Sequence, residues 1–504
     1  MRILFYLPDT GAGYLARALA ADLERTVGVE AAAAVIRKTA SRDHVRRGTS
    51  LFEPFISEPE IFGDGRGPAP AQEELRELEA RYGAPTLWQY VTMERYLSMT
   101  ALGGMSYRYG TDRSRAQLLG YVVHGLRSVE RMFDSFRPDA VVYCGVDVGS
   151  SVALMVDRVA RDREVPLAVP VSTRVGGYTV INDTIYSSCS ALEARYQALR
   201  AGQAQSPHAA EATRRLADLY HGRNELPHLH RNEQEATGGV TGRFQAAKAE
   251  LASLARGVKY RSWTDFRIPP PHRRMLAQRR VQRNRARILT HDLFVDHPRK
   301  DERYILCPLH VEPEMSQLLY APFYTNQLEV VRNVAQSVPA DTHLYVKDHP
   351  ALLGVRSWSY YEKLVRIPNV TLVRPTAAST ALIKGARGVI TITGTAALEA
   401  VFMGRPALTL GETIFSVDDA LVPRVSSPER LPQAIAGFDA TVPDPKAQHA
   451  YVSASLDVGG ETSPFHLCSQ SVNRTPEHIA SLPGYSVFVD LVTRRLQTAY
   501  TKSS

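Results

Sequence analysis

The sequence is poor in cysteine and contains no long uninterrupted apolar run. Its four cysteines, Cys144, Cys189, Cys307 and Cys468, stand far apart in 504 residues, and no two form a C-x-x-C pair. This spacing argues against a disulfide framework and against a zinc knuckle, and it favours a reducing compartment. No window approaches the roughly 18 uncharged apolar residues of a membrane span, so we expect no spanning helix.

The N-terminus lacks a basic leader long enough for export. Residues 1–24 begin with an apolar run and continue directly into an amphipathic pattern. That pattern is typical of a first strand and its helix rather than of a signal peptide. We therefore expect a cytoplasmic protein that is at most peripheral at the inner membrane.

The net charge of +8 is concentrated in one stretch of the chain. Eleven basic residues and a single acid, Asp265, lie between Arg256 and Arg287. Such a stretch can contact anionic lipid headgroups or a phosphate-bearing acceptor, and it can equally be a solvated helix face. It matches no known nucleic-acid-binding motif, so we expect no nucleic-acid partner.

Two parts of the sequence alternate short apolar runs with helical patterns. The first begins at RILFYLP and the second at RYILCPLHV. Continuous apolar runs of this kind are typical of buried parallel strands. The alternation predicts an α/β protein with two Rossmann-like, doubly wound parallel-sheet domains that face a cleft.

This pattern divides the chain into four parts. They are an acceptor domain at 1–190 with an insertion at about 53–113, a helical basic link at 191–300, a nucleotide-binding domain at 301–435, and a tail at 436–504 that packs back on the N-terminal lobe. In the nucleotide-binding domain we expect helices at 321–337, 358–366, 379–385 and 395–403.

A cluster of ionisable residues, His310-Val311-Glu312-Pro313-Glu314, follows the first strand of the second series. Ligands of such folds bind at the carboxyl ends of the strands, so chemistry is expected there. Carboxylates and a histidine can supply a nucleophile or a general acid and base. We interpret Glu314 as the catalytic carboxylate, Glu312 as its rival, and His310 as an orienting or protonating group. The alternative is an ordinary surface loop.

A second turn of interest, Lys347-Asp348-His349-Pro350, follows the strand LYV. Pro350 prevents the strand from continuing. The ring of His349 can donate to a phosphate oxygen, and Lys347 adds positive charge, so we predict nucleotide binding here. The alternative for His349 is that it caps the turn.

A third turn follows the strand GVITIT and leads into the helix that begins near Thr395. Its small residues, Gly394 among them, expose backbone N–H groups at a helix N-terminus, where a phosphate is well placed. Thr393 and Thr395 can add hydroxyl donors, and Glu399 can accept from ribose hydroxyls. Alternatively, Thr395 is an N-cap and Glu399 an exposed acid in the first turn.

The predicted acceptor site lies in the N-terminal lobe. Asp9 to Gly13 predicts a tight glycine turn in which Gly11 and Gly13 allow a ligand to approach the backbone. Asp147 and Arg174 follow later strands of the same series and can line the same site.

The segments YILCPLHVEPE, LYVKDHP and VITITGTAALEAVFMGRPALTLG, in this order, resemble the capsule polysaccharide biosynthesis family over about residues 303–411. Characterised members of that family are β-Kdo transferases of the GT-B fold that use CMP-Kdo. The resemblance implies a glycosyltransferase whose cytidine nucleotide contacts His349 through its phosphate. It likewise implicates Thr393, Thr395 and Glu399.

The sequence departs from this family in one loop. The family's loop reads Pro-Leu-Gln and is followed, four residues after the Gln, by a catalytic Asp. Here His310 stands in place of the Gln and Glu314 in place of the Asp. The departure leaves open which sugar is transferred and with which stereochemistry.

Three functions remain open on the sequence alone. The first is a glycosyltransferase that moves a sugar from CMP-Kdo, or a related nucleotide-activated donor, to a surface-polysaccharide or glycolipid acceptor. The others are a sugar-nucleotide epimerase and a non-catalytic carbohydrate-assembly protein of the same fold. The expected partners are the nucleotide sugar, the acceptor and an anionic membrane surface. The nucleotide sugar is a substrate, so no separate cofactor is expected, and no metal site is predicted.

Overall fold

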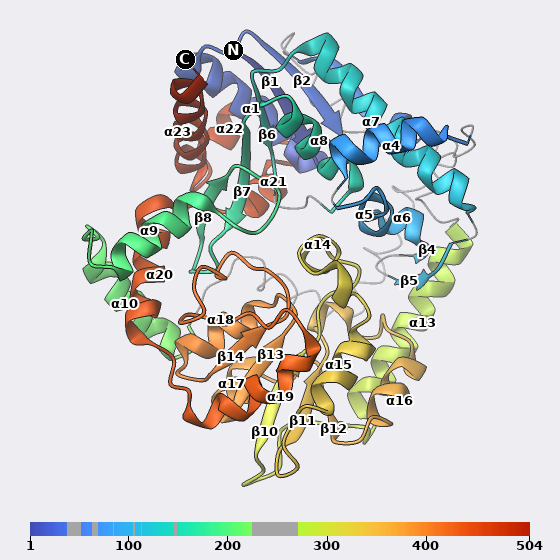
Figure 1. Cartoon of the computed structure of the whole chain (residues 1–504), viewed down its shortest axis with the longest axis vertical. Coiled ribbons are helices and arrows are strands. Elements are labelled where there is room, and N and C mark those ends of the chain that lie inside the picture. Colours follow the sequence, from blue (N-terminus) through green and yellow to red (C-terminus); the bar gives the residue numbers. More distant parts are fainter. Residues whose placement is uncertain are drawn as a thin grey trace.

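The computed structural model describes residues 1–37, 52–62, 69–83, 85–103, 106–111, 113–145, 149–223 and 271–503. Two α/β lobes lie one above the other in Figure 1, with the N-terminal lobe at the top. Each lobe is built around its own sheet, so the fold is the predicted pair of Rossmann-like domains.

The N-terminal sheet has seven strands in the order β15-β8-β7-β6-β1-β2-β3. Five of them, β1, β2, β3, β6 and β7, are parallel; at one edge β8 pairs antiparallel with β7, and β15 pairs antiparallel with β8. The apolar side chains of β1 are fully buried, as expected for a strand covered on both faces. The strands are β1 Arg2–Leu7, β2 Ala31–Ile36, β3 Phe52–Ser57, β6 Ala140–Tyr143, β7 Leu167–Ser172, β8 Tyr178–Asn182 and β15 Gly460–Glu461.

Helices and one hairpin complete this lobe. They are α1 Thr10–Val27, α3 Glu58–Phe62, α4 Gln72–Tyr82, α5 Trp88–Met93, α6 Arg95–Ser98, β4 Met99–Gly103, β5 Ser106–Tyr109, α7 Arg115–Phe136 and α8 Ser151–Asp162. Ser114 and Gln117 form a capping box that starts α7. The predicted insertion at 53–113 begins too early, because β3 is a strand of the sheet that pairs parallel with β2.

The C-terminal sheet has six parallel strands in the order β14-β13-β10-β11-β12-β9. They are β9 Phe294–Val295, β10 Tyr304–Pro308, β11 His343–Lys347, β12 Val370–Val373, β13 Gly388–Thr391 and β14 Ala407–Thr409. The edge strand β9 comes from residues before the predicted boundary at 301.

The connections of this sheet are mostly helical. They are α14 Met315–Leu318, the 3-10 turns η3 Pro322–Tyr324 and η4 Pro350–Leu352, α15 Gln327–Ala335, α16 Trp358–Val365, α17 Ser379–Gly385, α18 Thr395–Phe402 and α19 Leu431–Ala436. The helix predicted at 321–337 begins only at Gln327. Pro322 disfavours helical geometry in the residue before it, and the chain forms a 3-10 turn instead.

The segments outside the two sheets tie the lobes together. Helices α9 Ser190–Arg200 and α10 Ala209–Tyr220 pack on α20 Pro445–Val458, and α13 Pro271–Thr290 contacts the hairpin strand β4. The last helices, α21 Pro464–Ser471, α22 Pro476–Ala480 and α23 Tyr485–Ser503, contact α1, so both termini lie at the top of Figure 1. Residues 224–270 of the predicted basic link lie outside the described residues.

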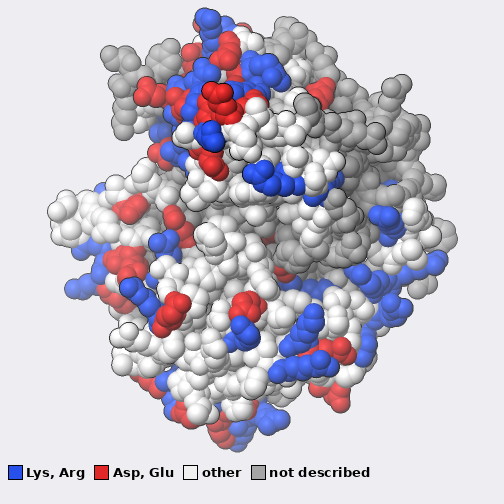
Figure 2. All heavy atoms as spheres, turned by 45° about the vertical axis from the view of Figure 1, so that its right-hand side comes forward, with Lys and Arg blue, Asp and Glu red and all other residues white. Residues whose placement is uncertain are grey.

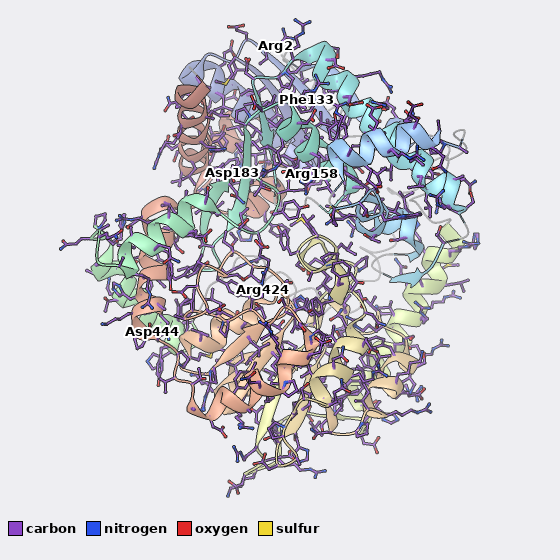
Figure 3. The ribbon with its side chains drawn as sticks, viewed as in Figure 1. Arg2, Phe133, Arg158, Asp183, Arg424 and Asp444 are labelled. Atoms are coloured by element: carbon purple, nitrogen blue, oxygen red, sulfur yellow. The ribbon has the colours of Figure 1, made fainter. Side chains whose placement is uncertain are left out.

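The lobes also meet around α14, which lies between them in Figure 1. Leu318 and Leu319 belong to an apolar core otherwise made by the N-terminal lobe. The hydroxyl of Tyr320 donates to the carbonyl of Ile185, at 3.2 Å. Figure 3 shows Arg158 and Asp183 on the side of the N-terminal lobe that faces the C-terminal lobe, and Arg424 on the facing side of the C-terminal lobe.

Candidate active site at the carboxyl edge of the C-terminal sheet

The three predicted turns meet at the switch point of the C-terminal sheet. Strand β10 lies between β11, its successor in the chain, and β13, which is reached only after the chain has passed β12. Such a reversal of strand order opens a crevice at the carboxyl ends of the strands, where ligands bind. The turns after β10, β11 and β13 carry His310, His349 and Thr393, respectively.

His310 holds the turn after β13 with its ring. Its Nε2 lies 2.9 Å from the hydroxyl of Thr391 and accepts the backbone N–H of Thr393 at 3.2 Å. The backbone N–H of Gly394 in turn donates to the Thr391 hydroxyl, at 3.2 Å. Because Nε2 is an acceptor, the neutral ring carries its proton on Nδ1.

This geometry does not fit the predicted role of His310 as a protonating group. Its side chain is buried, and burial, together with the charges of His349 and Arg356, lowers the pKa of His310 to about 3. The ring is therefore neutral near pH 7 and has no proton to give at Nε2. Its contacts instead position the turn between β13 and α18.

Glu312 is tied into its own loop. Its carboxylate forms an ion pair with Arg356 and accepts from the amide of Gln327 at 3.1 Å. Arg356 also pairs with Asp348 of the neighbouring turn, at 3.1 Å. A carboxylate held by two donors is poorly placed to act as a nucleophile, so this geometry disfavours Glu312 as the rival of Glu314.

Arg356 and Gln327 are site residues that the sequence analysis did not predict. Neither directly follows a strand, and neither lies at a recognisable spacing from the turns that it contacts. Gln327 starts α15, and Arg356 lies in the connection between η4 and α16. Only the fold brings their side chains to the crevice.

Glu314 is the exposed carboxylate of the loop. It is the N-cap residue of α14, and the hydroxyl of Ser316 donates to it at 2.9 Å. Its negative charge contributes to the raised pKa of Tyr320, after burial of that phenol as the main cause. Glu314 therefore lies where the two lobes meet, next to a residue that bridges them.

His349 caps its turn, which confirms the alternative that the sequence left open for this residue. Its Nδ1 accepts the backbone N–H of Ala351 at 3.2 Å, at the start of η4. Burial and the charges of Lys347 and Arg356 lower the pKa of His349 to about 4, against the opposing effect of Asp348. Because Nδ1 is the acceptor, the neutral ring carries its proton on Nε2. Capping the turn and donating to a ligand from Nε2 are thus compatible.

The start of α18 has the form of an anion site. Gly394, not Thr395, is the N-cap residue, and no side chain caps the helix. A Cβ atom at Gly394 would lie 2.6 Å from the hydroxyl oxygen of Thr391, so the close packing of this turn requires glycine. The hydroxyl of Thr393 donates to the carbonyl of Ser316, at 3.2 Å. The N–H of Ala397 donates to the Gly394 carbonyl at 3.2 Å, so the donors that this turn can offer to a ligand are the N–H groups of Thr395 and Ala396 and the Thr395 hydroxyl.

Glu399 is a shielded acid rather than an exposed one. Burial raises the pKa of its carboxyl, and the positive charges of Arg174 and Lys347 oppose that rise. Lys347 is buried at the end of β11, and Arg174 belongs to the loop between β7 and β8 of the other lobe. Charged groups of both lobes therefore act on this carboxylate.

The glycines of the N-terminal lobe do not form the predicted ligand turn. Residues Thr10 onward are already helical, so Gly11 and Gly13 lie in the first turn of α1. A Cβ atom at Gly11 would overlap the backbone carbonyl of Cys468 in α21. The close approach inferred for a ligand is thus made by the C-terminal tail.

The other two predicted acceptor residues differ in their placement. Asp147 lies outside the described residues. Arg174 has a left-handed backbone, with φ of 66°, which is uncommon for a residue with a side chain. Its charge acts on Glu399, Tyr320 and Tyr451, which places it toward the C-terminal lobe rather than toward Gly11.

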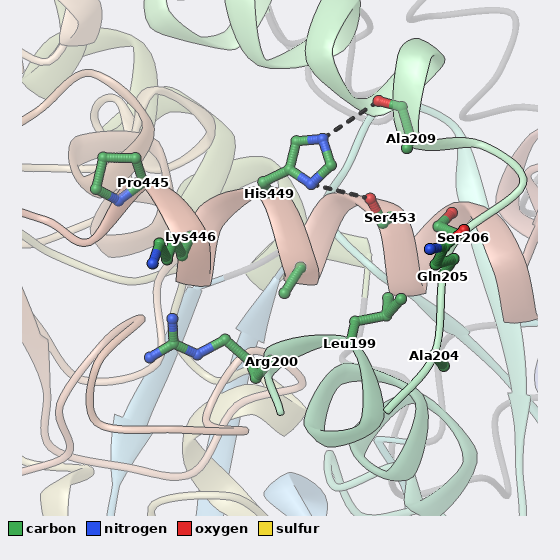
Figure 4. Close-up of a pocket in the computed structure, with 11 residues that line it drawn as sticks. Leu199, Arg200, Ala204, Gln205, Ser206, Ala209, Pro445, Lys446, His449 and Ser453 are labelled. Carbon is green, nitrogen blue, oxygen red and sulfur yellow. Dashed lines mark hydrogen bonds between the residues drawn. The ribbon is translucent and has the colours of Figure 1, made fainter. Parts of the chain in front are cut away.

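A separate cavity of about 520 Å³ lies between α9, α10 and α20, away from the crevice. Figure 4 shows Arg200 and Lys446 at one end, Gln205 and Ser206 at the other, and His449 between them. His449 is held by the carbonyl of Ala209, at 3.2 Å, and Arg200 pairs with Asp444 at 2.8 Å. The cavity contains none of the predicted site residues.

The described part of the chain offers no cluster of metal ligands. Within it, no three His, Cys, Asp or Glu side chains gather as a metal ion would require. None of the helices described combines the length and the apolar character needed to cross a membrane. The four cysteines are all buried and unpaired.

Comparison with known proteins gives one family and several distant structures. Residues 209–420 match the model of the family described as capsule polysaccharide biosynthesis protein. Protein FixF of Sinorhizobium fredii is 29% identical over 140 residues, which are 26% of this chain and 32% of that protein. The chain therefore spans about a third of the length of this curated relative.

The solved structures that resemble the chain are similar at low identity. The β-Kdo 2,7 transferase KpsC of Thermosulfurimonas dismutans is 13% identical with a TM-score of 0.33, covering 66% of this chain and 82% of its own. The UDP-GlcNAc 2-epimerase of Neisseria meningitidis bound to UDP-GlcNAc is 11% identical with a TM-score of 0.28, covering 94% and 98%. At such scores the fold assignment rests on the strand orders of the chain itself. The matched residues 209–420 make up less than half of the chain, and over this range the chain is similar to the capsule polysaccharide biosynthesis family.

Proposed function

We propose that this protein is a glycosyltransferase of capsule or surface-polysaccharide synthesis. It would transfer a sugar from a nucleotide-activated donor to a glycan or glycolipid acceptor, with the nucleotide bound at the switch point of the C-terminal sheet. The single observation that carries the proposal is the convergence of three polar turns at that point: His310 to Glu314, Lys347 to His349, and Thr393 to Thr395. The family match supports the same biological setting.

The electrostatics of the crevice suit a phosphate-bearing ligand. Lys347 and Arg174 are cations that act on the same carboxylate, and the start of α18 offers N–H groups without a side-chain cap. Glu399 can accept from ribose hydroxyls. We put a cytidine nucleotide first and Kdo or a related sugar as the transferred group, both by the resemblance of the three motifs to the capsule family.

Glu314 is the carboxylate that we assign to the reaction. It is exposed where the lobes meet, whereas Glu312 is held by Arg356 and Gln327. In a double displacement, the Glu314 oxygen would form a bond to the anomeric carbon while the bond from that carbon to the nucleotide phosphate breaks. The acceptor hydroxyl would then displace the carboxylate and lose its proton. In a single displacement, Glu314 would instead take the proton of the attacking hydroxyl.

The decisive experiment is a thermal-shift comparison of CMP, CDP, UDP and GDP. A nucleotide that binds only the folded state raises the melting temperature by mass action. We expect CMP to give the largest shift, and His349→Ala to reduce its affinity by a factor of about 10–100, as for loss of a hydrogen bond to a charged group. Absence of a shift with all four nucleotides would refute the proposal. Unchanged CMP affinity in His349→Ala would remove His349 from the site.

We further propose peripheral contact with an anionic membrane through α13. Its 20 residues contain seven arginines and no acid, and Met275 and Leu276 are exposed at its start. Basic side chains gather on the right-hand half of Figure 2, a view that brings forward the side of Figure 1 on which α13 lies. A basic residue near an anionic surface contributes about 1 kcal/mol and is screened by salt. The apolar pair can enter the interface beside these charges.

The test is co-sedimentation with vesicles that contain phosphatidylserine. We expect binding that weakens at high salt and drops when Arg279, Arg280 and Arg283 are changed to Ser. Replacing Arg303, Arg332 and Arg424, which are paired on other surfaces, is the matched control and should leave binding unchanged. If parent and α13 variant sediment equally, or if the parent does not sediment with the vesicles, the membrane proposal is refuted and α13 is a solvated helix face.

A further inference from the structure

Arg356 is a buried side chain that reaches three acceptors at once. Its Nη2 donates to the carbonyl of His310 at 2.7 Å, and its Nε donates to Asp348 at 3.1 Å. Its Nη1 donates to Glu312. Two of these acceptors belong to the turn after β10 and the third to the turn after β11. We propose that Arg356 is a positioning residue of the donor site, which sets the phosphate-binding turn after β13 through the ring of His310.

The path from Arg356 to that turn runs through the hydrogen bonds of His310. Gln327 accepts the His310 backbone N–H at 2.7 Å and donates to its carbonyl at 3.2 Å. Together with Arg356, it fixes the backbone from which the ring projects. The ring then accepts the N–H of Thr393 at 3.2 Å. A shift of this backbone would therefore move the N-terminal turn of α18.

Only an arginine at position 356 can pair with both carboxylates of this cluster and with the His310 carbonyl. Asp348 is buried, and it also accepts from the hydroxyl of Tyr361 at 2.7 Å. Arg356 lies over the ring of Tyr360, with 4.7 Å from its guanidinium carbon to the ring centre. A guanidinium presents donors in fixed, divergent directions, whereas an ammonium is a point charge with a single centre. Lysine can keep the charge but cannot reach all three acceptors in this geometry.

This inference rests on the proposed nucleotide site, so its test needs one readout that does not. Arg356→Lys is compared with the parent by hydrogen exchange of the segment that contains the Thr393 and Gly394 amides, and by nucleotide titration. We expect exchange of those amides to speed up at least tenfold, and nucleotide affinity to fall by a similar factor. His310→Ala combined with Arg356→Lys should weaken affinity no more than the stronger single change, because both act through one path.

A matched control distinguishes positioning from general loss of stability. Arg387 is also a mostly buried arginine with a carboxylate partner, Asp439, but it precedes β13 and so lies at the opposite edge of the sheet. Arg387→Met should leave the exchange of the Thr393 and Gly394 amides and the nucleotide affinity unchanged. Equal effects of Arg387→Met and Arg356→Lys would overturn the proposal, as would parent-like exchange of those amides in Arg356→Lys.

A second variant covers the case in which Arg356→Lys does not fold. Removing one charge leaves buried carboxylates unpaired, whereas neutralising the whole cluster is often tolerated. The triple change Glu312→Gln, Asp348→Asn and Arg356→Met should fold, yet exchange the Thr393 and Gly394 amides faster than the parent. Parent-like exchange in this variant would also overturn the proposal. If the parent binds no nucleotide, the proposed function is refuted. The exchange measurement still tests whether Arg356 positions the turn after β13.

Discussion

The neutral ring of His310 should make the protein lose stability as the pH falls below about 6.5. The folded pKa of His310 is lowered to about 3, from an ordinary histidine value of 6.5. The unfolded chain therefore binds a proton at this residue before the folded chain does. The contribution of His310 to the free energy of unfolding is fully present above pH 6.5 and is lost as the pH falls from 6.5 toward 3. Protonation in the folded state would place a proton on Nε2, where the Thr393 N–H already points.

The size of this effect follows from the lowered pKa. One pH unit below 6.5, the unfolded imidazole is about ten-elevenths protonated while the folded ring remains neutral. The loss of folding free energy at pH 5.5 is then about RT ln 11, or about 1.4 kcal/mol, for His310 alone. His349, with a pKa lowered to about 4, adds a loss of similar size at this pH.

Urea unfolding of the parent and of His310→Gln at pH 7.5 and 5.5 isolates this effect. Glutamine can accept the Thr393 N–H with its amide oxygen but does not titrate. Between the two pH values, the parent should lose about 1.4 kcal/mol more than the variant. Equal losses, or an NMR titration that gives the His310 ring a pKa near 6.5, would refute the acceptor role of Nε2.

Three further predictions concern single positions in the two lobes. Gly394→Ala should destabilise the protein by about 1–3 kcal/mol and weaken nucleotide binding, because its Cβ would meet the Thr391 hydroxyl at 2.6 Å; unchanged calorimetry and affinity would contradict this packing. Gly11→Ala should cost a similar amount by pushing against Cys468 yet leave nucleotide affinity unaltered, and a drop in affinity would connect this turn to the site. Glu314→Gln should bind nucleotide normally and lose transfer by a factor on the order of a thousand, whereas Glu312→Gln should affect stability first; near-normal transfer by Glu314→Gln would move the reaction to another carboxylate.

The regular part of the fold was predictable because it depends on local patterns. Buried parallel strands such as β10 and β13 appear as apolar runs, and the helix expected at 379–385 has those bounds in the structure. What local patterns cannot encode is a partner from far along the chain. Strand β15 joins the N-terminal sheet at β8 although almost 280 residues separate the two strands. No periodicity in the sequence predicts such a pairing.

In the candidate site, too, local patterns predicted the positions of the turns but not the partners of their side chains. The positions after the strands identified the turns, because the carboxyl ends of parallel strands share an edge. The roles within the turns depended on which atoms face each other. The sequence could not tell that His310 accepts from Thr393, or that Glu312 is held by Arg356. A residue type indicates what chemistry is available, and only its contacts decide which part of that chemistry is used.

Five strands of each sheet follow the same order, β3-β2-β1-β6-β7 in one and β12-β11-β10-β13-β14 in the other, but the two sheets use their switch points differently. In the N-terminal lobe, β1 and β6 flank the switch point, and α21 fills it: Gly11 packs on the Cys468 carbonyl, and a Cβ atom at Gly145 would lie 3.7 Å from the Cys468 sulfur. In the C-terminal lobe, the equivalent point is lined by backbone donors, two histidines and Lys347. A helix of the protein's own tail thus occupies in one lobe the position where the other offers donors to a ligand. An acceptor would then have to approach Glu314 from the space between the lobes, where Arg174 extends from the N-terminal side.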